Sequence, residues 1–357
     1  METCAVETVF SAGPATRAAP MRGRTTLTHS SLESFMRCPR EFELAYRELL
    51  APAAYAPPLA LGSAFHRGSE MLHHGPPLDQ ALRVADEVIE GYLARAALGL
   101  GEEKSRELDD QVRGDRARAH AMLRGWYERH FVPWNGDAVR RDLDLDVVET
   151  EVRIEAPLIN PKTMRASRLF TLAGRADGIV HHREENSRRG PSGVEGWHIL
   201  ETKTTGLNIE EFVETMGRSS QIAIYQHMAE RSLVPNPRPL LGTVVDVIAK
   251  PKLRPRSGES VEAFETRLVD LYRGEPDAMF RRVVLALDRD RMDETLADVW
   301  RIARQIRDAE RHGFARKSGP SCRGPFGWCR FRRLCWENDR AGYVTKEVAH
   351  EELADQE

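Results

Sequence analysis

The chain has 357 residues, of which 41% are hydrophobic and 7% aromatic, a composition typical of a globular protein with a sizeable core. No run approaches the roughly 18 consecutive apolar residues that a membrane helix needs, and the N-terminus lacks the apolar segment of a secretory signal. We therefore expect a soluble, cytoplasmic protein with no membrane partner. The formal net charge of -3 argues against a surface that binds polyanions throughout, so contacts with nucleic acid must come from local clusters of Lys and Arg.

The first third of the chain is predicted to be helical after a short tail. Residues 1–24 mix small, polar and Pro residues without a period, which predicts a flexible tail outside the fold. Ser30 and Glu33 have the spacing of a capping box, and apolar residues then recur at helical intervals, which predicts a first helix up to about Tyr46. Further helices are expected from about Leu59 to Gly75, over 79–97 and over 107–131.

The middle of the chain carries the strand signals. Segments rich in Val, Ile, Leu, Thr or Trp predict strands over 147–156, 169–182, 197–203 and 241–250. A long loop is expected over 183–196, and helices over 209–232, 259–285 and 289–312. These elements predict an α/β fold, a small mixed sheet flanked by helices, in a single domain over 25–340. Within it we expect a helical insertion over 78–135, a core over 145–250 and C-terminal helices with a cysteine-rich segment over 259–336, followed by a polar tail over 341–357.

Glu201 and Lys203 lie two residues apart on a predicted strand, so their side chains emerge on the same face. A carboxylate there can hold a divalent cation while the ammonium orients a water or a phosphate, and the carbonyl of Thr202 is a further candidate ligand. Such a pair alone is usually a solvated surface pair. Asp177 lies on the preceding strand, and pairing of the two strands could bring it to Glu201 as an oxygen site for Mg²⁺ or Mn²⁺. Taken alone, Asp177 and Gly178 are more often a turn.

Gln221 and Tyr225 are four residues apart on a predicted helix and therefore share one face. An amide and a phenol side by side can hydrogen-bond a phosphate and a sugar or base edge. The alternative is that Tyr225 belongs to the core and Gln221 to the surface. His66, on the helix after Leu59, is likewise most often a structural residue when it stands alone.

These residues follow one another in an order that closely resembles the RecB-like branch of the PD-(D/E)XK nucleases. The signature reads Gly62-Ser63-Ala64-Phe65-His66, Gly174-Arg175-Ala176-Asp177, Glu201-Thr202-Lys203 and Gln221-Ile222-Ala223-Ile224-Tyr225. The resemblance implies a restriction-endonuclease-like core in which Asp177 and Glu201 ligate the catalytic metal and His66 assists. It implies that Lys203 activates or positions the attacking water. By the same resemblance, Gln221 and Tyr225 position the DNA strand. The gap between Asp177 and Glu201 is longer than the family minimum.

Four cysteines form a second candidate site: Cys38, Cys322, Cys329 and Cys335. Four thiolates suit either tetrahedral Zn²⁺ or an iron–sulfur cluster, and the absence of a tight pair of cysteines favours the larger [4Fe–4S] cluster. One cysteine before the His66 helix and three after the core is also the arrangement that the resemblance implies for the iron–sulfur members of the family, AddB among them. We interpret the cluster as a structural staple, with Cys4 outside it.

Two basic clusters accompany these sites. The first is Lys250, Lys252, Arg254 and Arg256, which we predict to bind DNA, and the second is Arg323, Arg330, Arg332 and Arg333 around the cysteines. Either could equally be solvated surface. The aromatic residues Phe326, Trp328, Phe331 and Trp336 are available to stack on bases. Packing over the cluster is the alternative, and we favour it for Trp336.

The resemblance predicts a phosphodiester hydrolase that is a DNA exonuclease in repair, recombination or end processing, with single-stranded DNA or DNA ends as its substrate. No phosphate-binding loop of a helicase is present, so the chain would act alone or with a helicase or recombination partner. A non-catalytic DNA-binding or scaffold subunit of a repair complex is the main alternative. A redox or zinc-stabilised structural protein is a more remote one.

Overall fold

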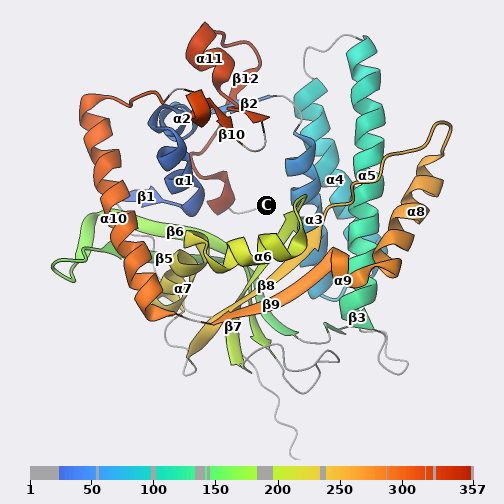
Figure 1. Cartoon of the computed structure of the whole chain (residues 1–357), viewed down its shortest axis with the longest axis horizontal. Helices are drawn as coiled ribbons and strands as arrows, with labels where there is room; N and C mark the ends of the chain where they lie inside the picture. The colour runs from blue at the N-terminus through green and yellow to red at the C-terminus, as the bar shows by residue number, and fades with distance from the viewer. Residues whose placement is uncertain are drawn as a thin grey trace, which may run out of the picture.

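A six-stranded mixed sheet lies at the centre of the molecule, with helices on its flanks (Figure 1). The computed structural model describes residues 24–53, 56–97, 102–132, 141–142, 145–182, 196–233, 239–286, 288–317, 319–324 and 327–354. The predicted loop over 183–196 therefore lies outside the described residues except for Gly196, and so does the tail over 1–23. No helix in the described ranges is long and apolar enough to cross a membrane.

The four predicted strands are all present, and each of the first two is longer than expected. They are β5 (Leu145–Ile159), β6 (Ala166–His182), β7 (Gly196–Thr205) and β8 (Leu240–Ala249). β6 pairs antiparallel with both β5 and β7, while β7 and β8 run parallel. The sheet also contains β1 (Thr25–Leu27), parallel to β6, and β9 (Phe280–Ala286), antiparallel to β8. The predicted α/β class with a mixed sheet is confirmed.

β9 corrects the sequence prediction, which placed a helix over 259–285. The helix α8 ends at Gly274 (Val261–Gly274), a short helix α9 follows (Pro276–Met279), and the chain then enters the sheet. The segment that forms β9 pairs with β8 from Gly242 to Ile248. A short run of this kind adopts the strand that its neighbour offers, so tertiary pairing overrides a weak local preference.

The predicted first helix is interrupted at Cys38. α1 (His29–Arg37) ends there, α2 (Pro39–Phe42) begins with Pro39, and a π-helical segment η1 (Glu43–Arg47) continues the chain. Cys38 has an extended backbone, as expected for a residue that precedes proline. The capping box at the start of α1 is also different from the predicted one, since Thr28 and Ser31 form it. Because of this break, Cys38 lies between α1 and α2 and not within a continuous helix.

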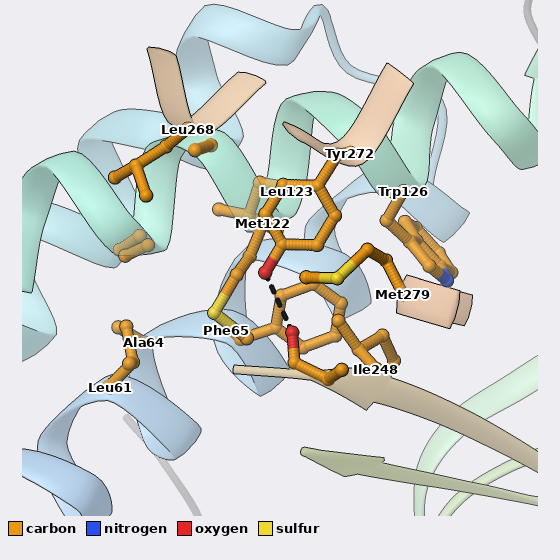
Figure 2. Packing of buried hydrophobic residues seen from close by; sticks show 14 of the residues in the cluster. Leu61, Ala64, Phe65, Met122, Leu123, Trp126, Ile248, Leu268, Tyr272 and Met279 are labelled. Atoms are coloured by element: carbon orange, nitrogen blue, oxygen red, sulfur yellow. Dashed lines mark hydrogen bonds between the residues drawn. The ribbon is translucent and has the colours of Figure 1, made fainter. Parts of the chain in front are cut away.

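The predicted helical insertion packs against the sheet as a bundle of long helices (Figure 1). Its described helices are α4 (Leu78–Ala97) and α5 (Glu102–His130), and they pack with the His66 helix α3 (Pro57–His73), which precedes the insertion, and with α8 from later in the chain. Figure 2 shows the core between them, where Phe65, Trp126 and Tyr272 are buried together and Ile248 of β8 joins them from the sheet. The Tyr272 hydroxyl donates a hydrogen bond of 2.7 Å to the carbonyl of Ala249, which ties α8 to the sheet.

A second core lies under α1, α7 and α10. The predicted helix over 209–232 is two helices, α6 (Ile209–Gly217) and α7 (Ser220–Ser232), because the Ser219 side chain caps a new helix start by accepting from the Gln221 amide. α10 (Arg289–His312) agrees with its prediction. Buried side chains of α1, α7 and α10 pack with those of β5 and β6.

The C-terminal part returns to the N-terminal part. A 3-10 turn η2 (Gly319–Cys322), strands β10 (Arg323–Gly324) and β11 (Gly327–Trp328) and the short helix α11 (Arg332–Glu337) form the cysteine-rich segment. The segment expected to be a polar tail pairs with the fold instead, since β12 (Tyr343–Thr345) is antiparallel to β2 (Leu50–Pro52). A last turn, η3 (Glu351–Leu353), accepts hydrogen bonds from Arg175 of β6 and buries Leu353.

Candidate active site

The register of β6 and β7 brings Asp177 and Glu201 together. Gly178 and Leu200 are the last paired residues, so Asp177 and Glu201 are the next two positions opposite each other, where the strands part. The Thr202 amide donates a hydrogen bond of 2.5 Å to Asp177 Oδ2. β6 runs through Asp177 and Gly178 to His182, as the strand predicted over 169–182 requires, so the turn that this dipeptide alone would favour does not occur. The extra length between the two acids, residues 183–195, lies outside the described residues.

Glu201 is only 2% exposed and has polar partners on one side of its carboxylate. Lys203, two residues on along β7, donates from Nζ to Glu201 Oε1, and Gln221 donates from Nε2 to the same oxygen over 2.8 Å. The second oxygen, Oε2, is buried and has no hydrogen-bond partner in the described part of the chain. Burying half of a carboxylate without a partner is costly, so this oxygen is suited to a ligand.

His66 reaches the site from α3, with its Nδ1 atom 3.5 Å from Asp177 Oδ2. Gly62, one turn earlier, allows α3 to approach the sheet: a Cβ atom there would lie 3.3 Å from Thr204 Oγ1. Burial, followed by the charge of Lys203, lowers the pKa of His66 to about 4. The imidazole is therefore neutral at pH 7 and can offer a nitrogen lone pair.

Tyr225 lies one turn after Gln221 on α7 and is 9% exposed. Burial and the nearby Glu201 carboxylate raise its pKa far above the ordinary range. A Cβ atom on Gly174 would lie 2.8 Å from Tyr225 Cε1, so this glycine of β6 makes room for the ring. The structure thus combines the two alternatives for this pair: the Tyr225 ring is core, while Gln221 contacts the acidic site.

The carboxylates of the site are buried and repel one another. Burial, against the opposing pull of Lys203, raises the pKa of Asp177 to about 6. Burial also raises the pKa of Glu201, with Asp177 contributing in the same direction. Burial alone would lower the pKa of Lys203, but the charges of Glu201 and Asp177 hold it above its ordinary value. The site therefore carries a surplus of negative charge, which a cation would relieve.

Two further acids that the sequence analysis missed lie beside the site. Glu70 follows His66 by one helical turn, and Glu151 lies on the neighbouring strand β5 opposite Asp177, between the pairs Thr150–Gly178 and Val152–Ala176. His66, Glu70, Glu151 and Lys250 line a cavity of about 480 Å³. Glu151 has a positive φ of 50°, and burial with Asp177 raises its pKa to about 7. Helical spacing from His66 could have indicated Glu70, whereas Glu151 depends on strand register.

The donor set at this point fits a hard divalent cation. Carboxylate oxygens from two neighbouring strands, among them the unpartnered Glu201 Oε2, are ligands of the kind that Mg²⁺ and Mn²⁺ take, and the neutral His66 imidazole lies beside them. Within the described ranges, no three His, Cys, Asp or Glu side chains form a ready-made metal site. The carboxylates of Asp177 and Glu201 instead hydrogen-bond to Thr202, Lys203 and Gln221.

The predicted DNA-binding cluster is divided by the fold. Lys250 belongs to the cavity beside His66, and its Nζ donates to the carbonyl of Pro58 over 2.7 Å. Burial lowers the pKa of Lys250. Lys252, Arg254 and Arg256 follow on the exposed coil that leaves β8.

The four predicted cluster cysteines are all free thiols and lie in one region. Cys38 is buried, and its Sγ accepts from the Lys317 amide over 3.5 Å. The Cys329 amide donates to the carbonyl of Cys322 over 2.7 Å. Burial, and then neighbouring charges that include Cys38, raise the pKa of both Cys329 and Cys335. Cys4 lies outside the described residues.

A sequence model described as the PD-(D/E)XK nuclease superfamily matches residues 26–336. The match covers α1 through α11 and so includes the sheet, the acidic site and all four clustered cysteines. No curated protein matches the chain. The members of this superfamily are phosphodiester-hydrolysing nucleases that generally use divalent metals such as Mg²⁺ or Mn²⁺. Together with a mixed sheet flanked by helices, the match shows that the chain belongs to the PD-(D/E)XK nuclease superfamily.

Proposed function

We propose that the chain is a metal-dependent DNA exonuclease whose active site is built from Asp177, Glu201 and Lys203. The observation that carries the proposal is the buried Glu201 carboxylate, which has Lys203 and Gln221 on one oxygen and no hydrogen-bond partner among the described residues on the other. Asp177 is the next carboxylate across the sheet. An acidic pair with an open oxygen and an adjacent ammonium is suited to hydrolysis at a phosphate.

Each side chain has a separate task in this proposal. Asp177, Glu201 and the carbonyl of Thr202 hold Mg²⁺ or Mn²⁺, and His66 assists with its neutral imidazole. When bound, the cation supplies Lewis acidity and a more nucleophilic water. Lys203 orients the attacking water or offsets charge on the phosphate, held in position by Glu201. Gln221 orients Glu201 and, with Tyr225 behind it, positions the DNA strand.

The substrate that we propose is single-stranded DNA or a DNA end. The cavity beside His66 has a volume of about 480 Å³ and is lined by residues of α3, α4 and the sheet. Lys250 at its wall and the exposed Lys252, Arg254 and Arg256 next along the chain offer contacts to phosphates. We propose that the chain belongs to a RecB-like branch of the superfamily and acts in DNA repair, recombination or end processing in the cytoplasm. We propose a helicase or recombination protein as its partner. We also propose that 25–340 acts as one nuclease domain.

The test is cleavage of end-labelled single-stranded and duplex DNA in Mg²⁺ or Mn²⁺, with EDTA as the blank. Lys203→Ala is expected to lower the rate by at least about a hundredfold, since a positioned charged group contributes on that order. Lys162→Ala removes an exposed lysine on the turn between β5 and β6 and is the matched control. An intact wild-type protein that binds DNA but does not cleave it in either metal would instead support a non-catalytic subunit.

We further propose that Cys38, Cys322, Cys329 and Cys335 bind a [4Fe–4S] cluster that staples the two ends of the domain, with Zn²⁺ as the alternative. The four thiols are free and lie in one region, which supports this proposal. Cys38 is close enough to contribute to the raised pKa of both Cys329 and Cys335. The described cysteines do not form a ready-made metal site, so a bound cluster would draw the thiols together. A ligand that joins Cys38 to a segment nearly 300 residues later would restrict the unfolded chain strongly.

Metal analysis of anaerobically purified protein tests this second proposal. About four irons and four sulfides per chain, with visible absorbance that Cys329→Ser abolishes, is the expected result. Cys4→Ser is the matched control, because Cys4 is the fifth cysteine and lies outside the set. One equivalent of zinc without iron would favour the zinc site, and neither metal would refute both.

A further inference from the structure

Beside the cysteines, two tryptophans are exposed in a concave surface. Trp328 is 57% exposed and Trp336 is 54% exposed, whereas Phe331 is buried and Phe326 lies outside the described residues. The preference for Trp336 as a residue packed over the cluster is therefore not supported by its exposure. The concavity has a volume of about 640 Å³, and its lining includes Trp328, Trp336, Arg323, Arg332, Cys322 and Glu337. We call the first four residues the Trp–Arg platform.

The charge of the platform is complementary to a polyanion. The guanidinium carbons of Arg323 and Arg332 lie 5.7 and 5.1 Å from the centre of the Trp328 ring. Neither arginine forms an ion pair with a carboxylate within the described part of the chain. The acid of the concavity, Glu337, lies 3.9 Å from Arg333. An exposed indole with two cations at its ring is a surface on which bases stack while phosphates meet charge.

The platform is connected to the acidic site by a single short helix. α1 begins at His29, whose Nε2 is 3.1 Å from Ser220 Oγ, next to Gln221. The same helix leads into Cys38, whose Sγ accepts from the Lys317 amide over 3.5 Å, while the Cys322 thiol donates to the Lys317 carbonyl over 3.4 Å. Nine residues of helix span about 13 Å. In Figure 1, β10 and α11 accordingly lie beyond the C-terminal end of α1, beside α2.

We propose that the Trp–Arg platform binds single-stranded DNA by stacking bases on Trp328 and Trp336, and that it holds the strand which the active site cleaves. The proposal rests on the proposed nuclease function and adds a second point of contact, a few nucleotides from the scissile phosphate. A duplex hides the faces of its bases, so the platform discriminates for single strands or frayed ends. Arg323 and Arg332 supply phosphate contacts that are independent of sequence.

Binding of a fluorescein-labelled 15-mer of thymidine, measured by anisotropy with the full chain in EDTA, tests the proposal without cleavage. Trp328→Ala is expected to weaken binding roughly tenfold, the usual order for loss of one base–aromatic stack. Trp328→Phe retains a ring and should stay within about threefold of the wild type. Arg332→Gln should reduce the slope of log affinity against log salt by about 0.7, the contribution of one phosphate contact to a single strand. Arg83→Gln, an exposed arginine on α4, is the charge-matched control and should change neither quantity.

The competing occupant of this surface is the iron–sulfur cluster itself. If the tryptophans only shield it, Trp328→Ala will lose iron faster in air, while the iron-loaded fraction binds the 15-mer as tightly as the wild type. That result would refute the proposal that the platform binds DNA. Equal binding by the wild type, Trp328→Ala and Trp328→Phe would refute it as well. If Trp328→Ala fails to fold, the test is the quenching of tryptophan fluorescence by the 15-mer. If the platform binds DNA, Trp328→Phe must show less quenching than the wild type. Cleavage of DNA in Mn²⁺ by the same preparations is recorded separately, so failure of the nuclease proposal is distinguishable.

Discussion

Replacing Asp177 by asparagine is expected to stabilise the metal-free protein while removing its activity. The carboxyl is ionised at pH 7.5, yet its pKa is raised from 3.8 to about 6, chiefly by burial. Two pH units correspond to about 3 kcal/mol of unfavourable free energy for the charged form at about 1.36 kcal/mol per unit. An asparagine has nearly the same shape, carries no charge and can still accept the hydrogen bond from the Thr202 amide.

The pH dependence follows from the direction of the shift. Above pH 6 the Asp177 carboxyl is charged in both the folded and the unfolded states, so the whole cost to the folded state is present. As the pH falls from 6 to 4, Asp177 becomes protonated in the folded state before it does in the unfolded state, and the destabilisation of the folded state by its charge declines. Below about pH 4 both states are protonated and the advantage of the asparagine variant should vanish.

Thermal unfolding in EDTA at pH 7.5 and pH 4.5 measures the effect. For a chain of this length, 3 kcal/mol corresponds to roughly 4 °C, from about 2.1 cal/mol/K of unfolding entropy per residue. Mg²⁺ at about 1,000 times its Kd should reverse the order at pH 7.5, since it then adds about 4.1 kcal/mol to the wild type and nothing to a variant that cannot bind it. Asp79→Asn, on exposed α4, is the matched control and should shift neither curve. An asparagine variant less stable than the wild type in EDTA at pH 7.5 would refute this account of the site.

Three further substitutions test other parts of the structure. Glu151→Gly should raise the free energy of unfolding by about 1 kcal/mol, because the positive φ of 50° suits glycine and a crowded carboxylate is removed. In thermal unfolding, Glu151→Ala should gain less stability than Glu151→Gly. His120 is expected to stabilise the fold below pH 6.5 and to lose that effect as pH rises through 9, since two carboxylate neighbours outweigh burial and raise its pKa to about 9. A difference in melting temperature between His120→Gln and the wild type that stays constant from pH 6 to 10 would contradict this. Gly174→Ala should displace the Tyr225 ring and destabilise the protein by roughly 1–3 kcal/mol in urea unfolding, whereas Gly206→Ala, with open space around its Cβ, should not.

Local periodicity was enough to predict several features of the fold and site. The strand period of two places Glu201 and Lys203 on one face of β7, and their side chains are in contact. The helical period places Gln221 and Tyr225 one turn apart on α7, a single-helix relation that needs no knowledge of the fold. The four long strands were predicted from their high content of Val, Ile, Leu, Thr and Trp, which favour the extended backbone.

Other features required the tertiary structure. The strand over 280–286 was predicted as a helix because its seven residues form a strand only where β8 provides hydrogen bonds. The break at Cys38 could have been read from Pro39, whereas its consequence, a thiol turned toward a segment nearly 300 residues away, could not.

The same division holds for the acidic site. Motif order indicated which acids to consider, but only the register of β6 with β7 sets Asp177 opposite Glu201, and only its register with β5 sets Glu151 on the other side. A shift of one residue in either pairing would turn these carboxylates to opposite faces of the sheet. Sequence alone therefore determined the chemical types and the local spacing of the site residues. Tertiary pairing decided which of them meet, because register depends on contacts between segments that are distant in the chain.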